Sequence, residues 1–103
     1  MKIIYQNLLP PSGFAAIMLF GVIFARKKYR PLSERIINHE KIHAAQAKDC
    51  GGWIRFYWKY IILWMCFGYD QHPMEREAYD HDADLTYLED RFSFEWMIYV
   101  PEK

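Results

Sequence analysis

The sequence predicts a single α+β domain in which a small N-terminal sheet or hairpin is followed by three helices. Its 103 residues suffice for one domain, so residues 1–103 are treated as one unit. A composition that is 52% hydrophobic and 18% aromatic is typical of a chain with a packed core. Segments rich in β-branched and aromatic residues come first, and segments with helix-capping and helix-ending residues follow them.

The strands are expected near the N-terminus. Residues 3–8 contain isoleucine and tyrosine, which favour a short strand, and the Pro-Pro-Ser-Gly segment at 10–13 predicts a turn. Residues 14–25 are almost continuously apolar. They are expected to form one strand or two, bent or paired as a hairpin around Gly21. A basic loop should cover residues 26–31.

The first helix is bounded by clear signals. Ser33 can cap its N-terminus, and Glu34 lies in the first turn, where a negative charge interacts favourably with the helix dipole. Gly51 and Gly52 should end the helix near Asp49, because glycine readily adopts the left-handed conformation that terminates helices.

Two more helices and a tail are expected after it. Residues 53–67 are apolar and aromatic almost all round, which is typical of a helix that is buried in a core or contacts a membrane or a partner protein. Pro73 suits the first position of a third helix that reaches residues 88–91. Residues 92–103 should form a short strand or an extended cover.

Charge and cysteine content exclude several classes of protein. The 13 Lys and Arg balance the 13 Asp and Glu, and the basic residues form no nucleic-acid-binding motif, so no nucleic acid partner is expected. Cys50 and Cys66 form no CxxC pair, which argues against a disulfide framework. The apolar run 14–25 is shorter than the roughly 20 residues of a membrane-spanning helix. We expect a cytoplasmic protein, with peripheral membrane association through residues 53–67 as the alternative.

Residues 39–43 read His-Glu-Lys-Ile-His, the HExxH pattern, within the first predicted helix. Residues one helical turn apart share a face, so His39 and His43 can bind one Zn²⁺ at about 2.0–2.1 Å. Glu40 lies next to them and can take a proton from a zinc-bound water without being a ligand. The segment therefore predicts a zinc site with Glu40 as the general base.

A catalytic zinc site needs a third protein ligand, with water at the fourth position. Asp49 lies ten residues after His39, as in the HExxHxxGxxD pattern. However, Gln46 stands where that pattern has the glycine that ends the helix. The other candidates lie in or just before the third predicted helix: His72, Glu75, Glu77 and His81.

The order of these motifs resembles the gluzincin metallopeptidases, which carry HExxH on one helix and a glutamate in an ExxA context on a later one. Glu75 with Ala78 matches the second motif best. Residues 13–96 also look like a group of small bacterial metallopeptidase-like proteins of unassigned activity. The resemblance implies a minimal zincin-like domain. In it, the two motif histidines and Glu75 hold zinc, and Glu40 activates water to hydrolyse a peptide or protein.

The same resemblance implies further roles. An acidic residue one turn after the ligand often orients a metal-bound histidine, but Tyr79 stands there, which leaves Asp80 or Asp82 for this role. A residue that stabilises the oxyanion is expected among three candidates: Tyr69, His72 and Tyr79. A strand within residues 14–24 would border the cleft as an edge and pair with a peptide, or else be a plain core strand.

Two other functions fit the sequence. One is a zinc-binding protein of zincin-like fold without peptidase activity, since 103 residues leave little material for a second lobe around a deep cleft. The other is a small membrane-associated interaction protein in which the HExxH pattern is incidental.

Overall fold

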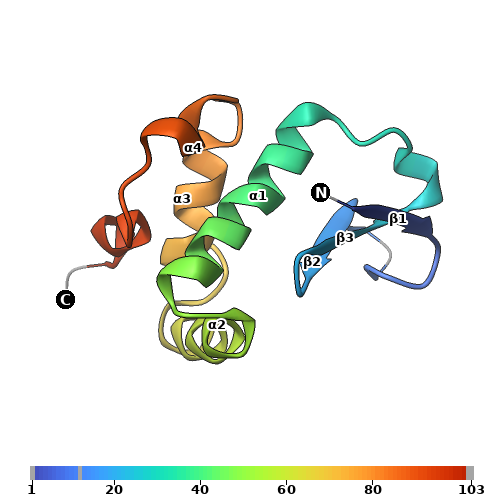
Figure 1. Ribbon diagram of the computed structural model, residues 1–103. Coiled ribbons are helices and arrows are strands. Elements are labelled where there is room, and N and C mark those ends of the chain that lie inside the picture. The colour runs from blue at the N-terminus through green and yellow to red at the C-terminus, as the bar shows by residue number, and fades with distance from the viewer. Residues whose placement is uncertain (1, 12, 102–103) are drawn as a thin grey trace.

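The computed structural model describes residues 2–11 and 13–101 and confirms the α+β class, because a three-stranded sheet precedes four α-helices in this part of the chain (Figure 1). The strands are β1 (Ile3–Gln6), β2 (Ala16–Leu19) and β3 (Val22–Arg26). The α-helices are α1 (Glu34–Asp49), α2 (Trp53–Phe67), α3 (Pro73–His81) and α4 (Tyr87–Asp90). Two short 3₁₀ helices are η1 (Lys27–Tyr29) and η2 (Glu95–Tyr99).

The sheet has β3 at its centre. β1 pairs with β3 in parallel, with Ile3 opposite Ile23, and β2 pairs with β3 antiparallel. The β2–β3 hairpin turns at Phe20 and Gly21, whose φ angles of 51° and 88° are both positive, as a tight two-residue hairpin turn requires. The hairpin expected around Gly21 is therefore confirmed, and β1 and β2 are the edges. Ser12, part of the turn predicted before the hairpin, lies outside the described residues.

The edge strand β2 contacts both α1 and a side chain of α2. The Tyr57 hydroxyl of α2 donates to the Met18 carbonyl at 3.2 Å and accepts from the Phe20 N–H at 3.0 Å. This end of the edge is thus already hydrogen-bonded within the molecule.

α1 forms where the capping signals predict it. Oγ of Ser33 accepts a hydrogen bond from the Ile36 N–H at 3.2 Å. The helix ends at Asp49 and is followed by Gly51 and Gly52, whose φ angles are 88° and 134°. α1 runs between the sheet on one side and α3 on the other (Figure 1).

Buried side chains hold α1 from both sides. The cluster that involves the sheet comprises Met18, Ile23, Ala25 and Leu32. The cluster that joins α1 to α2, α3 and the C-terminal segment comprises Ala47, Phe56, Met74 and Trp96. The HExxH residues consequently lie on a helix that is packed on both of its flanks.

The expectation that residues 53–67 pack as a core helix is wrong for most of α2. Phe56 is its buried residue, whereas six large apolar side chains are exposed: Ile54, Trp58, Ile61, Ile62, Trp64 and Met65. A chain of 103 residues buries a limited share of its surface, and no further layer of the described chain covers this face. Within residues 2–11 and 13–101, no helix combines the length and the apolarity needed to cross a membrane.

The third helix is shorter than predicted, and a fourth helix replaces its expected end. α3 stops at His81 instead of continuing to residues 88–91, and α4 follows as a separate turn of helix. The cause lies in α1, where the Asn38 amide donates to the carbonyls of Asp82 and Asp84 at 3.0 Å each. These bonds satisfy carbonyls that the continued helix would otherwise use.

The C-terminal segment is not a strand. Its described part forms η2, which packs on α3, and residues 102–103 lie outside the description. The Arg76 guanidinium of α3 donates to the Tyr99 carbonyl at 3.0 Å, and Trp96 is buried against the helices. The segment covers α3, but as a 3₁₀ helix and not in the extended conformation that was expected.

Candidate metal centre

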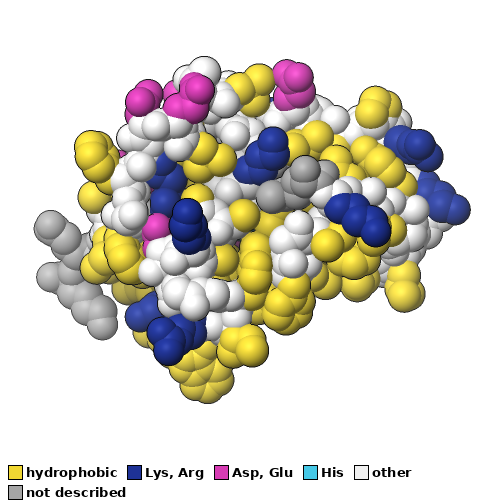
Figure 2. Space-filling model, viewed as in Figure 1, with side chains coloured by type: hydrophobic (Ala, Val, Ile, Leu, Met, Phe, Trp, Pro, Cys, Tyr) yellow, Lys and Arg dark blue, Asp and Glu magenta, His cyan; other side chains and the backbone are white. Residues whose placement is uncertain are grey.

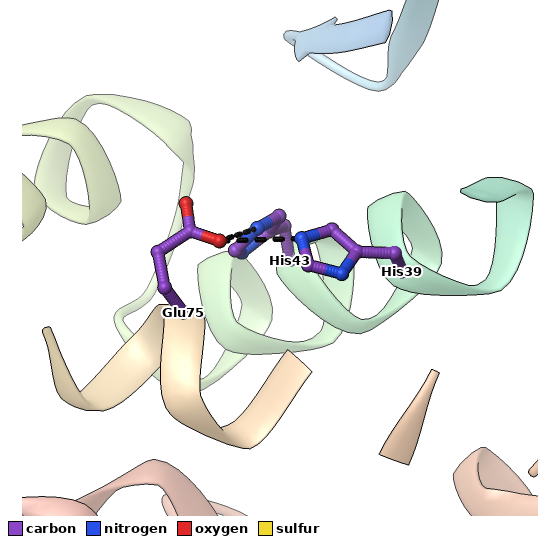
Figure 3. Close-up of side chains that lie close together, drawn as sticks. All are labelled: His39, His43 and Glu75. Carbon is purple, nitrogen blue, oxygen red and sulfur yellow. Dashed lines mark hydrogen bonds and ion pairs between the residues drawn. The ribbon is translucent and has the colours of Figure 1, made fainter. Parts of the chain in front are cut away.

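Three side chains from two helices converge on one point. His39 and His43 project from α1 and Glu75 projects from α3, and both rings face the same carboxylate oxygen (Figure 3). Nε2 of His39 lies 3.2 Å and Nε2 of His43 lies 3.1 Å from Oε1 of Glu75. The structure thus brings together the three residues that sequence and resemblance proposed as ligands.

The spacing of these atoms suits a single metal ion. The three ligand atoms lie within 4.8 Å of one another. Zinc bonds of about 2.0–2.1 Å at a tetrahedral angle separate neighbouring ligand atoms by about 3.3 Å. The two nitrogen–oxygen distances match that separation, so the donor set fits zinc.

Two of the three groups, His43 and Glu75, are buried and shift each other's pKa. Burial alone would lower the pKa of His43, but the charge of Glu75 and its hydrogen bond raise it to about 9. Burial alone would raise the pKa of Glu75, but the charge of His43 and hydrogen bonds from both imidazoles and Tyr60 lower it well below its usual range. A cation, whether a proton or a metal, is therefore favoured between them.

Each histidine is oriented through its other nitrogen. Nδ1 of His39 lies 3.0 Å from Oδ2 of Asp82, whose other oxygen accepts from Arg35 at 2.7 Å. Nδ1 of His43 lies 2.9 Å from Oε1 of Gln46. Because a carboxylate and an amide oxygen only accept, each Nδ1 carries a hydrogen, so Nε2 is the nitrogen that a metal would bind, in place of a proton shared with Glu75.

Gln46 is itself held in place. Its Nε2 donates to the Met74 carbonyl at 2.8 Å and to Oε1 of Glu77 at 3.0 Å. The amide orientation follows from these two acceptors, and it presents Oε1 to His43. The residue that departs from the HExxHxxG pattern is therefore one that supports the site.

Tyr60 secures the third candidate ligand. Its hydroxyl donates to Oε2 of Glu75 at 2.5 Å, while Oε1 faces the two histidines. Burial raises the pKa of Tyr60, and the neighbouring Glu75 carboxylate raises it further, so the phenol keeps its proton and remains a donor. Glu75 is thus fixed with one oxygen turned to the metal position.

Glu40 lies beside the three groups as a separate carboxylate. It is 8% exposed, and within the described chain it forms no ion pair and no hydrogen bond through its side chain. Burial raises the pKa of Glu40, against the opposing influence of His43 and His39. A raised pKa makes a carboxylate a stronger proton acceptor, which is the property a general base needs.

Comparison with known proteins identifies no relative of this chain. No protein-family model, no curated protein and no solved structure matches it. The likeness to gluzincins consequently stays a resemblance that rests on the HExxH pattern and the Glu75 motif.

The other two acidic candidates belong to a structural network. The Arg91 guanidinium donates to Asp49 at 2.7 Å and to Oε2 of Glu77 at 2.5 Å, and the Tyr87 hydroxyl donates to Glu77 at 2.7 Å. Side chains in the Arg91 pairs are at most 5% exposed. Asp49 and Glu77 thus neutralise a buried arginine and do not join the cluster of Glu75.

The remaining histidines are also engaged elsewhere. His72 is fully buried, with Nε2 donating to the Tyr60 carbonyl at 2.9 Å and Nδ1 accepting from the Met74 N–H. Burial lowers the pKa of His72, and both of its ring nitrogens are already engaged within the protein. His81 stacks on Tyr87 at 3.8 Å between ring centroids.

Two tyrosines line the approach to Glu75. The hydroxyls of Tyr69 and Tyr79 lie 2.8 Å apart, and the Tyr79 ring lies 4.5 Å from the His39 ring. Both residues line a pocket of about 270 Å³ that also includes Glu75 and Arg76. They are therefore the two predicted oxyanion candidates that keep access to this pocket.

Sequence reasoning missed two residues of the site. Gln46 follows His43 by three positions on the same helix, a spacing that places side chains together, so it could have been found. Tyr60 lies among seven aromatic residues in 53–67, and nothing in their order distinguishes the one that reaches Glu75.

Proposed function

We propose that this protein is a zinc-dependent peptidase in which His39, His43 and Glu75 hold the metal and Glu40 is the general base. The observation that carries the proposal is the convergence of three ligand atoms beside a buried carboxylate that is otherwise unengaged. Two imidazoles with one carboxylate form a donor set typical of catalytic zinc.

Neighbouring residues orient the candidate ligands through hydrogen bonds. Asp82 and Gln46 accept from the Nδ1 hydrogens and so direct each Nε2 toward Glu75. Tyr60 keeps one oxygen of Glu75 facing the histidines. When bound there, zinc would lower the pKa of a water to about 7 and polarise a carbonyl oxygen.

The proton of that water would pass to Glu40, whose pKa is raised by burial. Tyr69 and Tyr79 offer hydroxyl donors for the developing oxyanion, because they border the pocket beside Glu75. A substrate would reach the three groups through this pocket, whose other lining residues include Arg76 and Asp80.

Metal analysis tests the first half of the proposal. Protein purified without chelators should contain about one zinc per chain, and His39→Ala and Glu75→Ala should reduce this to below about a tenth. Glu89→Ala, at an exposed position on α4, is the matched control and should retain zinc. A zinc content that is negligible in the wild type, or unchanged by His39→Ala, would contradict the proposed metal site.

Peptide hydrolysis tests the second half. Glu40→Gln should keep zinc and abolish turnover, because the amide cannot accept the proton. Glu34→Gln, the same substitution at an exposed position of the same helix, should keep both. Turnover retained by Glu40→Gln would indicate another catalyst, and zinc without turnover in the wild type would favour the zinc-binding alternative.

A further inference from the structure

The outer face of α2 carries an apolar stripe. Four side chains at helical spacing, Ile54, Trp58, Ile61 and Met65, are 78%, 69%, 50% and 83% exposed. The opposite face of the same helix, which includes Phe56, packs into the core. Exposed apolar patches of this kind on a folded domain mark a surface that meets another phase or partner.

The C-terminal 3₁₀ helix extends this apolar surface. Met97 of η2 and Phe94, which directly precedes η2, line a groove of about 860 Å³ together with Ile54 and Trp58. Trp96 also lines the groove, and its Nε1 is buried with no hydrogen-bond partner in the described part of the chain. The groove therefore offers an apolar floor with an unused donor.

Positive charge borders the stripe. Arg55 and Lys59 lie one turn apart along one side of it, and α2 contains no acidic residue. Neither forms an ion pair with another residue of 2–11 or 13–101. Figure 2 shows hydrophobic side chains together with Lys and Arg at the end of the molecule where α2 lies, whereas most visible Asp and Glu lie at the opposite end.

We propose that this face of α2 docks on a membrane surface that carries anionic phospholipid. Apolar side chains would enter the interface while Arg55 and Lys59 meet the lipid phosphates, as in interfacial amphipathic helices. Trp58 suits the headgroup level, where an amphipathic ring is favoured. A second copy of the chain fits less well, because its α2 face offers no acidic residue to pair with these bases.

The helix would lie in the plane of the interface. Its 15 residues span about 22 Å, which is less than the roughly 30 Å of a hydrocarbon core. Its inner face is occupied by the protein. Tyr60 of the same helix bonds Glu75, so docking would place the candidate metal centre next to the membrane. This last consequence rests on the proposed function, whereas docking itself does not.

Vesicle sedimentation tests the proposal. The full chain should bind vesicles of phosphatidylcholine with phosphatidylserine on the order of tenfold more strongly than vesicles of phosphatidylcholine alone. Binding to the anionic vesicles should weaken in 1 M salt. Arg55→Gln with Lys59→Gln should remove most of the preference for anionic lipid. Trp58→Ser with Met65→Ser should weaken binding to both vesicles.

Control variants distinguish membrane docking by α2 from nonspecific adsorption and from dimerisation. Leu8→Ser removes an equally exposed apolar side chain far from α2 in sequence and should leave binding unchanged. Glu40→Gln should also bind fully, since docking needs no turnover. Three results would overturn the proposal: no binding to anionic vesicles, equal loss with Leu8→Ser, or a dimer in light scattering that Trp58→Ser dissociates without any vesicle binding.

Discussion

Replacing Glu75 by glutamine should lower the pKa of His43 in the metal-free protein. Burial favours the neutral imidazole, but the charge of Glu75 and its hydrogen bond at 3.1 Å raise the pKa of His43 to about 9. Glutamine keeps the shape of the side chain and removes its charge. Burial then remains as the largest influence, opposed only by Glu40 and Gln46, so the pKa of His43 should fall well below 9.

The same coupling predicts a pH-dependent free energy of unfolding. The pKa of His43 is higher in the folded than in the unfolded state, so its stabilisation is complete below pH 6.5 and is lost as pH rises through about 9. One pKa unit corresponds to about 1.4 kcal/mol, so the rise in the pKa of His43 from 6.5 to about 9 makes this loss at most about 3.5 kcal/mol. The metal-free Glu75→Gln variant should not show this loss of stability between pH 6.5 and pH 9.

NMR titration of the imidazole nitrogens measures the pKa, and urea unfolding at pH 6.5 and pH 9.5 measures the stability. Glu89→Gln replaces an exposed glutamate of α4 and should leave both quantities unchanged. A pKa of His43 that stays near 9 in Glu75→Gln, or that lies near 6.5 in the metal-free wild type, would refute the coupling.

Three further predictions concern the site and the fold. Tyr60→Phe should weaken zinc binding by about tenfold in competition with a chromophoric chelator, because the carboxylate ligand loses its hydrogen bond, and unchanged affinity would argue against this positioning role. Arg91→Met should lower the free energy of urea unfolding by about 3–5 kcal/mol, since it leaves Glu77 and Asp49 buried without their partner, whereas Arg55→Met on the surface should change it by less than about 0.5 kcal/mol. With free zinc at a hundredfold excess over its dissociation constant, removal of the zinc should lower the free energy of unfolding by about 2.7 kcal/mol. The melting temperature should fall by roughly 10–20 °C, and an unchanged melting temperature would contradict a zinc site in the folded state.

Local signals in the sequence were sufficient for much of the fold. α1 begins after Ser33 and ends before Gly51 as the capping rules predict, and the hairpin turns at Gly21. These features depend on backbone preferences of one or two residues, which are the same in any context. The predicted membership of His39 and His43 in one cluster likewise follows from helix periodicity alone.

Other features depended on partners distant in sequence. Asn38 on α1 binds the carbonyls of Asp82 and Asp84 just after α3, and no residue of α3 indicates this. The exposure of α2 follows from the absence of any covering layer in the described chain, which its hydrophobicity alone did not predict. The third ligand was suggested by resemblance, and Glu75 was separated from Glu77 when the structure placed Arg91 beside the latter.

By itself, the sequence determined the α+β class, the position of the first helix and the chemical types gathered on it, because these depend on local conformation and on residue identity. Only the tertiary structure decided which carboxylate faces the histidines, which side chains orient them and which face of the aromatic helix stays exposed. The reason is physical: a ligand cluster is defined by distances of about 3 Å between residues far apart in sequence, and packing of whole helices sets those distances.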